Sequence, residues 1–301
     1  MSAVDRFAEL MTGHQRRLVA EFEDLDPGGR FARHPWRSPG LGHGEARTLE
    51  DGGVFERAAV NVSVLRSRDL HPVAAPGPEL AGREYSAASI SMVLHAVNPY
   101  VPSFHANFRY FEVSDADGEW WLGGGMDMTP SYGFETDAES FHKAIKRCCD
   151  EHEIGAYQEW KKNCDEYFYV KHRGEMRGVG GVFFDHLTGS GADRTALAAF
   201  TGGALTAISE AYLPIVRRRM GTPYGDAQRN WQLARRGRYV EFNLVYDIGT
   251  TFGLNTGVDA DNVLASLPPV VRWSRGVVPE PGSAEERLSS FLQPRDWAGD
   301  R

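Results

Sequence analysis

The fold of this chain is decided by residues 91–135, which begin SMVLHAVNPYVPSFHANFRYFEV and end WWLGGGMDMTPSYGFE. Between residues 104 and 110, apolar side chains alternate with polar ones, a period of two that predicts a β-strand with two unlike faces. A shift of one residue would bury the polar set and expose the aromatic set, so the pattern specifies the register. The apolar face carries Phe104, Ala106, Phe108 and Tyr110, and the polar face carries His105, Asn107 and Arg109.

A second predicted strand, residues 86–95, lies a short loop upstream and alternates in the same way. Consecutive strands usually pair, so we expect the two polar faces to form one surface on a rigid sheet. An antiparallel pair with one ordinary solvated face would show the same alternation. The polar face of this second strand carries Ser89, Ser91, Val93 and His95, and its apolar face carries Ile90, Met92 and Leu94.

The segment that follows favours a site over a plain solvated face. Trp120 and Trp121 precede the glycines 123–125, and Asp127 comes just beyond them. Glycine within a strand-like segment indicates that the backbone passes close to something bulky. We therefore expect a turn at these glycines that presents Asp127 to a ligand.

Composition and charge narrow the class of protein. The chain has 301 residues, with 42% hydrophobic and 25% charged, which is typical of a soluble globular protein. Its formal net charge of −8 and the lack of a basic stripe argue against nucleic-acid binding. An anionic substrate would need local cations. Arginines do cluster near residues 173–177, 217–219 and 235–238, but such clusters are more typical of a solvated surface.

The N-terminus and the cysteines indicate the compartment. Residues 2–24 predict an amphipathic helix rather than a signal peptide. No apolar run is long enough to span a bilayer, so we expect no membrane insertion. Cys148, Cys149 and Cys164 are too few and too clustered for a disulfide framework. These features predict a cytoplasmic location.

The order of the predicted elements indicates α+β architecture with a largely antiparallel sheet, in a single domain of residues 1–301 without repeats. Residues 26–44 and 71–82 are rich in proline and glycine and predict surface loops. Pro214 should end or kink its helix near Leu213. Strands are expected near 58–65, 86–95, 104–113, 118–123, 239–247 and 270–273, and helices near 2–24, 137–150, 155–172, 194–220, 259–266 and 283–292.

Four of the ten histidines fall at positions that suit a site. Two lie on the adjacent strands and two on neighbouring helices, so together they could bind a divalent metal. Each of them alone is more typical of a core or helix-end histidine, and no HExxH or CxxC spacing is present. The four residues are His95, His105, His142 and His172.

Several blocks of the chain, in the same order, resemble the oxygen-dependent coproporphyrinogen III oxidases of haem biosynthesis, over roughly residues 50–297. The resemblance implies a broad, flat antiparallel sheet with helices on both faces. It also implies a homodimer, with residues 239–274 in the dimerisation region. There the presumed strand YVEFNLVYD would place Val240, Phe242, Leu244 and Tyr246 on one apolar face. The blocks are DGGVFERAAVN at 51–61, NPYVPSFHANFRYFE at 98–112, WWLGGGMDMTPSYGFE at 120–135, DEYFYVKHRGEMRGVGGVFFD at 165–185, AYLPIVRRR at 211–219, RRGRYVEFNLVYDIGTTFGL at 235–254 and LPPVVRW at 267–273.

The resemblance implies an enzyme that converts two propionates of coproporphyrinogen III into vinyl groups, giving protoporphyrinogen IX. Dioxygen is consumed as co-substrate, and carbon dioxide and hydrogen peroxide are released. No organic cofactor is implied, and the chain has no GxGxxG after a strand, no P-loop and no Gly-x-Ser-x-Gly elbow. The four histidines match positions that bind a divalent metal such as manganese in some members, as an optional site.

The resemblance also assigns roles to residues of the polar face. It implies that His105 is the proton donor, that Asp127 accepts hydrogen bonds from pyrrole N–H groups and stabilises positive charge, and that Arg109 holds a propionate bidentately. The substrate-contacting positions that it implies are Ser91, Asn107, Phe108, Arg109, Gly257, Val258 and Asp259.

Departures from the family pattern leave the substrate open. Gly257-Val258-Asp259 replaces a usual Gly-Gly-Arg, Val97 replaces a basic residue, and His186 replaces the second acid of Phe-Phe-Asp-Asp. Two cations that would bind carboxylates are therefore missing, unless Arg173 or Arg235 compensates. The ordinary enzyme is favoured. The alternatives are a paralogue that uses dioxygen to oxidise or decarboxylate a different carboxylate-bearing substrate, and a non-catalytic metal-binding homodimer.

Overall fold

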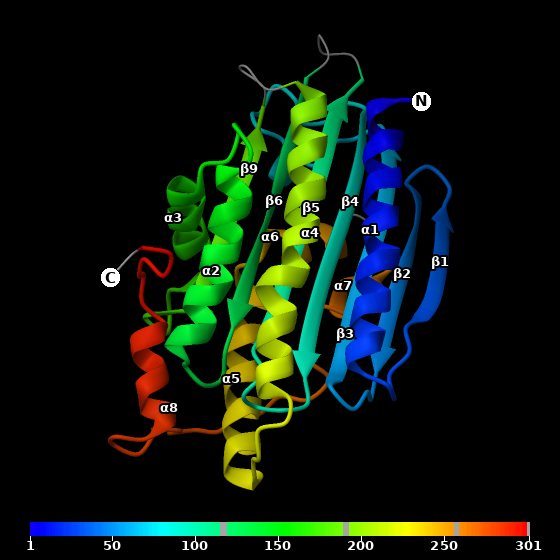
Figure 1. Ribbon diagram of the computed structural model, residues 1–301. Coiled ribbons are helices and arrows are strands. Elements are labelled where there is room, and N and C mark those ends of the chain that lie inside the picture. The colour runs from blue at the N-terminus through cyan, green and yellow to red at the C-terminus, as the bar shows by residue number, and fades with distance from the viewer. Residues whose placement is uncertain (115–118, 189–192, 256–258, 300–301) are drawn as a thin grey trace.

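The computed structural model describes residues 1–114, 119–188, 193–255 and 259–299. Its centre is an antiparallel sheet of seven strands in the order β1-β2-β3-β4-β5-β6-β9, with a separate β7-β8 pair (Figure 1). The predicted α+β class and antiparallel sheet are confirmed. The strands of the large sheet are β1 Ala32–Ser38, β2 Gly42–Glu50, β3 Phe55–Ser67, β4 Tyr85–Ala96, β5 Ser103–Val113, β6 Trp120–Thr129 and β9 Gly180–Leu187.

One face of the sheet is covered by α1 (Ala3–Leu25), α2 (Glu135–Asp150) and α4 (Arg194–Arg219) (Figure 1). The predicted apolar face of β5 lies against these helices. Phe104 stacks on Tyr212 of α4 with ring centroids 4.9 Å apart. The main hydrophobic core therefore lies between this face of the sheet and the three helices.

Helix α4 passes through Pro214 without ending, so of the two predicted outcomes, an end or a kink near Leu213, the end does not occur. Pro214 is exposed while Leu213 and Ile215 are buried. Packing of the residues on both sides of the proline thus holds the helix. The apolar window of α4 is long enough for a membrane span, and 56% of that window is buried within the fold.

The other face of the sheet carries α5 (Asp226–Val245), α6 (Ile248–Asn255) and α7 (Ala260–Leu264), which lie behind the strands in Figure 1. The predicted strand at 239–247 is wrong, because most of this segment is the C-terminal part of α5. A short alternation of apolar residues does not distinguish strand from helix. The residues that α5 buries recur every three or four positions, and they include Gln232, Arg236, Tyr239, Val240 and Asn243.

Other boundaries also differ from the prediction. Strands β1 and β2 occupy part of the segment expected to be a loop. β1 is an exposed edge strand that contains Pro35, so its place in the sheet depends on pairing with β2 rather than on apolar alternation. No strand forms at 270–273. The helix predicted at 155–172 is shorter, since α3 spans Tyr157–Tyr167. It is followed by β7 (Tyr169–Val170), which pairs with β8 (Glu175–Met176) further along the chain.

The C-terminal segment has short helices only, α8 (Ala284–Arg287) and η2 (Leu288–Phe291), where one helix was expected at 283–292. The loop predicted at 71–82 is confirmed, apart from the single turn η1 (Pro72–Ala74). This loop and α6 cover one end of the second sheet face with a small apolar cluster. The rest of that face is available for polar side chains.

Candidate functional site

The predicted pairing of the two polar strands is confirmed. β4 and β5 pair antiparallel, and β6 extends the same face from the other side of β5. The polar surface foreseen from the alternation therefore exists on one sheet face. Its cross-strand partners are Ser89 with Arg109, Ser91 with Asn107, Val93 with His105, and His105 with Asp127.

His105 and Asp127 form the closest polar pair on this surface. His105 Nδ1 lies 2.8 Å from Asp127 Oδ1. The imidazole is 26% exposed, whereas the carboxylate, which lies beside it on β6, is 2% exposed. The histidine ring is therefore partly accessible, with its orientation held by the neighbouring carboxylate.

Arg177 completes this arrangement from the segment after β8. Its guanidinium is 1% exposed and lies 2.8 Å from each oxygen of Asp127. It also donates to Asn243 Oδ1 of α5 at 2.8 Å. Its carbon lies 4.1 Å from the ring centre of Phe168 and 4.6 Å from that of Tyr239. Stacking and hydrogen bonding together hold this charge in a buried place.

The ionisation of Asp127 reflects these contacts. Burial on its own opposes ionisation of the carboxyl group, but the charge of Arg177 and the hydrogen bond with His105 outweigh it. The pKa of Asp127 consequently lies below its usual value. Asp127 is thus a permanently charged group that orients His105, and its low pKa makes it a poor proton acceptor.

The glycines before Asp127 lie within β6 and not in the expected turn. A Cβ on Gly123 would come within 2.4 Å of Asp185 Oδ1 and 3.0 Å of Arg109 Nε. A Cβ on Gly125 would come within 2.3 Å of the Val182 carbonyl oxygen. The bulky neighbour foreseen from the glycines is therefore the adjacent strand and the side chain of Arg109, which crosses β6.

Arg109 uses that space to reach β9. It donates to Asp185 Oδ2 at 2.7 Å and to Asn107 Oδ1 at 3.0 Å. Both Arg109 and Asp185 are about a quarter to a third exposed, with values of 26% and 31%. A substrate carboxylate at Arg109 would therefore compete with Asp185, which the sequence alone had not singled out.

The structure does not bring all of the predicted contact residues to this face. The side chain of Phe108 points to the opposite face, where it is buried near Phe184. Asp259 caps α7 by accepting a hydrogen bond from the backbone N–H of Asp261. Gly257 and Val258 lie outside the described residues. Ser91, Asn107 and Arg109 remain as the predicted substrate contacts on the surface.

The four histidines do not gather in the structure. His95 bonds to Ser103 Oγ at 2.9 Å and to the Ser266 carbonyl oxygen at 3.0 Å. His142 bonds to Tyr157 Oη at 2.8 Å and to the Val179 carbonyl oxygen at 3.0 Å. Burial lowers the pKa of each of these two imidazoles to about 3, so both are neutral core histidines.

His172 lies elsewhere, between Tyr246 Oη and Glu241 Oε2. In the part of the chain that the structure describes, no group of three or more His, Cys, Asp or Glu side chains could hold a metal ion. Since both ring nitrogens of His95 and of His142 are used by protein groups, these rings do not fit a shared metal. No chemical step is therefore assigned to a metal.

Two further departures have visible places. His186 lies near the end of β9 beside Asp185, with a φ of 53° and its ring 6.0 Å from that of Trp121. Val97 is half-buried and donates its backbone N–H to the Val54 carbonyl oxygen. Neither adds a cation to the polar face close to Arg109.

A comparison with protein families gives one further finding. The family model described as coproporphyrinogen III oxidase matches residues 6–297, which is nearly the whole chain and includes every strand of the large sheet.

Proposed function

The chain belongs to the coproporphyrinogen III oxidase family, and from that premise we propose that it uses dioxygen to convert coproporphyrinogen III into protoporphyrinogen IX. In each of the two steps, a propionate loses carbon dioxide, one proton from the carbon next to the pyrrole ring and two electrons, and becomes a vinyl group. Those electrons, together with two protons, reduce dioxygen to hydrogen peroxide. The observation that carries the proposal is the buried Arg177–Asp127 pair, which is hydrogen-bonded to a partly exposed His105.

His105 is the proton-transfer group in this proposal. Asp127 Oδ1 accepts a hydrogen bond from His105 Nδ1. This bond favours the tautomer with its proton on Nδ1, so that Nε2 is the nitrogen that exchanges a proton with the substrate. The bonded Asp127 carboxylate also stabilises the His105 imidazolium that forms when the ring takes up a proton. The pair therefore suits proton exchange with the pyrrole ring system of the substrate during oxidation.

The role of Asp127 is refined by its burial. The resemblance gave it direct contact with pyrrole N–H groups. Its carboxylate is 2% exposed and already bonded to Arg177 and His105. We therefore propose that Asp127 acts on the substrate through His105, both by orienting the ring and by balancing its charge.

Arg109 is the proposed carboxylate anchor. It lies on the same face of β5 as His105, further along the strand, and its guanidinium is partly exposed. A planar guanidinium binds a carboxylate bidentately, which fixes orientation as well as position. Asp185 already accepts a hydrogen bond from the Arg109 guanidinium. A substrate carboxylate would therefore have to bind alongside Asp185 or displace it.

A second candidate function is dioxygen-dependent oxidation or decarboxylation of a different carboxylate by the same face. The observation that favours it is the acid Asp259 at the start of α7, where a cation was expected. The third interpretation, a non-catalytic metal-binding homodimer, has no support in the described residues, since they form no metal-binding cluster.

Aerobic incubation with freshly reduced coproporphyrinogen III tests the proposal. We expect protoporphyrinogen IX to accumulate without added nucleotide or flavin and in the presence of a metal chelator. The products are oxidised and separated by chromatography, and an anaerobic reaction is the control. If no product forms in air, the proposed activity fails and the paralogue becomes the better candidate.

We also propose that the protein is a cytoplasmic homodimer. Apolar side chains are exposed along the end of α5 and along α6, within the region that the resemblance links to dimerisation. The face is not the one foreseen, since Val240 and Phe242 are buried in the core. The exposed residues are Leu244, Val245, Ile248 and Leu254. The cysteines are all free and buried, which suits a reducing compartment.

A further inference from the structure

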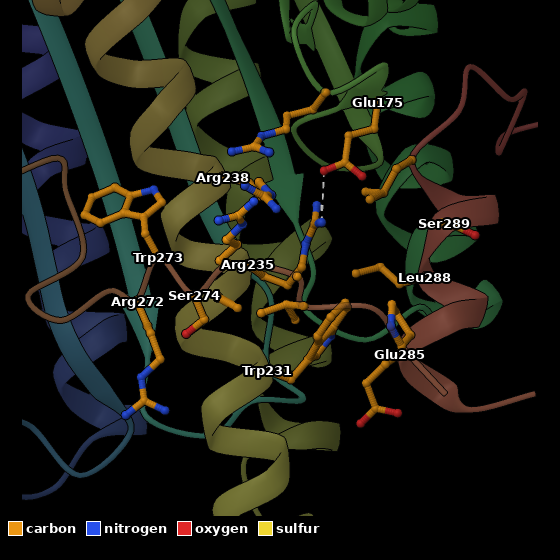
Figure 2. Close-up of a pocket in the computed structure, with 17 residues that line it drawn as sticks. Glu175, Trp231, Arg235, Arg238, Arg272, Trp273, Ser274, Glu285, Leu288 and Ser289 are labelled. Atoms are coloured by element: carbon orange, nitrogen blue, oxygen red, sulfur yellow. Dashed lines mark hydrogen bonds and ion pairs between the residues drawn. The ribbon is translucent and has the colours of Figure 1, made fainter. Parts of the chain in front are cut away.

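A cavity of about 670 Å³ lies between α5, residues 272–279 and residues 285–292 (Figure 2). Helix α5 presents Trp231, Arg235 and Arg238 to this cavity, while it turns Arg236 and Asn243 toward the sheet. None of the proposed catalytic residues lines the cavity. Its size falls within the range of small-molecule sites, roughly 300–1,000 Å³. It is therefore a separate candidate site on another side of the same helix.

Positive charge gathers in this cavity. Five arginines line it, against only two glutamates. The chain as a whole has a formal net charge of −8, so the local sign is opposite to that of the average field. A local excess of cations attracts anionic ligands. The five residues are Arg173, Arg235, Arg238, Arg272 and Arg275.

Two of these guanidinium groups have no carboxylate partner among the described residues. Arg272 donates to the neutral amide oxygen of Asn230 at 2.7 Å, and no acid is paired with Arg275 in the described ranges. The other three arginines are paired with Glu175 or Glu241. An anion that entered the cavity would therefore meet two cations that are not already paired with a carboxylate, although Glu175 and Glu285 also line the cavity.

Arg235 adds a third, partly unsatisfied group. It pairs with Glu175 at 2.9 Å, and its side chain is only 10% exposed. Its buried Nε has no hydrogen-bond partner. Burial lowers the pKa of Arg235 even though Glu175 opposes that effect. This charge is poorly compensated where it stands, and an additional anion nearby would stabilise it.

The remaining walls are flat or apolar. Figure 2 shows Trp273 and Arg272 on one side of α5 and Leu288 on the other side, with Trp231 between them. Trp273 is 57% exposed, which leaves much of its indole open to a ligand. Indole and guanidinium planes stack on ring systems. This combination selects a flat apolar body that carries negative groups.

We propose that this cavity binds a flat ring system bearing carboxylates, at a site separate from the one on the sheet. Two sources supply this chemistry, a carboxylated tetrapyrrole and a smaller aromatic carboxylate. The tetrapyrrole source rests on the proposed function, because the substrate and product of that reaction belong to this class. The smaller source is independent of it.

The experiment compares two probes, coproporphyrin III and 1-naphthoate, titrated into the full chain by calorimetry. Arg272→Gln combined with Arg275→Gln should raise the dissociation constant at the cavity roughly tenfold or more, a change that two lost charge contacts readily supply. The matched control replaces the exposed Arg16 and Arg217 with glutamine and should bind like the wild type. Binding should also weaken with added salt.

Coproporphyrin III should show two classes of sites in the wild type. The Arg272/Arg275 double variant should keep only the sheet site, and Arg109→Gln should keep only the cavity site. If 1-naphthoate alone binds the cavity, the ligand is a small aromatic carboxylate. The proposal is overturned if the double variant binds both probes like the wild type, or if neither probe occupies a site outside the sheet.

Two further measurements separate this proposal from the proposed function. The double variant should retain the thermal midpoint and the turnover of the wild type, because its residues lie outside the sheet site. A wild type without oxidase activity would defeat the proposed function, yet the 1-naphthoate titration would still decide whether the cavity binds carboxylates.

Discussion

Arg177 and Asp127 form a buried ion pair in which one guanidinium nitrogen lies 2.8 Å from each carboxylate oxygen, with exposed fractions of 1% and 2%. The pair lies beside His105, the cross-strand neighbour of Asp127, whose imidazole is 26% exposed. A charge pair in this position costs free energy to desolvate. We propose that the pair offsets this cost through its effect on the neighbouring imidazole.

Replacing Asp127 separates its charge from its shape. Asp127→Asn keeps the shape but leaves the Arg177 charge buried without compensation. We expect it to lower turnover nearly as much as Asp127→Ala, by several orders of magnitude, because His105 loses the group that orients and balances it. Turnover is measured well below the midpoint of thermal unfolding. Near-normal turnover of Asp127→Asn on its best substrate would show that the carboxylate is only structural.

Removing both members of the pair should restore stability but not activity. Breaking a buried pair on one side costs about 3–5 kcal/mol of the free energy of unfolding. The double variant Asp127→Asn with Arg177→Met should recover most of that loss while remaining inactive. Urea unfolding and turnover of the two single variants and the double variant form a thermodynamic cycle. An active double variant would contradict the role given to the pair.

Arg109 and Asp185 should have opposite effects on substrate binding. Arg109→Lys keeps the charge but loses the planar fork, so we expect a higher KM together with a lower kcat. Asp185→Asn removes the acid that occupies Arg109 and should lower KM. Steady-state kinetics on the two variants decide the matter. A KM for Asp185→Asn as high as that for Arg109→Lys would mean that Asp185 positions the arginine instead of competing with the substrate.

Glu56 should make the anchoring of α5 depend on pH. It pairs with Arg229 and Arg236 of that helix, each at 2.6 Å. Burial opposes ionisation of Glu56, but the two arginines outweigh it and lower its pKa below the usual value of 4.5. The unfolded chain therefore binds the proton more readily, and this stabilisation is present above pH 4.5 and lost as the pH falls below it.

Glu56→Gln is the variant that tests this anchor. We expect it to reduce the free energy of unfolding by about 2 kcal/mol at pH 7, in line with hydrogen bonds to charged groups. The difference from the wild type should shrink between pH 5 and pH 3, as followed by urea unfolding at each pH. A difference that stays constant across this range would show that the ionisation of Glu56 does not stabilise the fold.

The exposed apolar end of α5 should form the subunit contact. We expect a dimeric mass by light scattering at micromolar concentration for the wild type. Leu244→Asp combined with Val245→Asp should give a monomer, because charged groups at the centre of an interface are strongly unfavourable. The control is Val278→Asp, another exposed apolar position at 80% exposure on a different segment. A monomeric wild type would remove this proposal altogether.

The local pattern of the chain was sufficient for the two strands that carry most of the site. The alternation along residues 86–95 and 104–110 predicted β4, β5 and the polar surface that they share, and the amphipathic spacing of residues 2–24 predicted α1. These features are readable because each depends on the periodicity of one segment. The strands β1, β2 and β9 were missed, since none of them shows a clear alternation and β1 is an exposed edge strand.

Only the tertiary structure decided which charges meet. Asp127 and Arg177 are 50 residues apart, and Asn243 is a further 66 residues beyond Arg177. A sequence shows where an arginine lies, but not whether folding will bury it against a carboxylate or leave it in water. The sequence by itself determined the family, the strands β4 and β5, and the place of His105 on their polar face. Three features depended on long-range packing: the buried pair beside His105, the separation of the four histidines and the helical state of residues 239–245. Long-range packing joins residues that are far apart in the chain, so the pattern of one short segment does not reveal it.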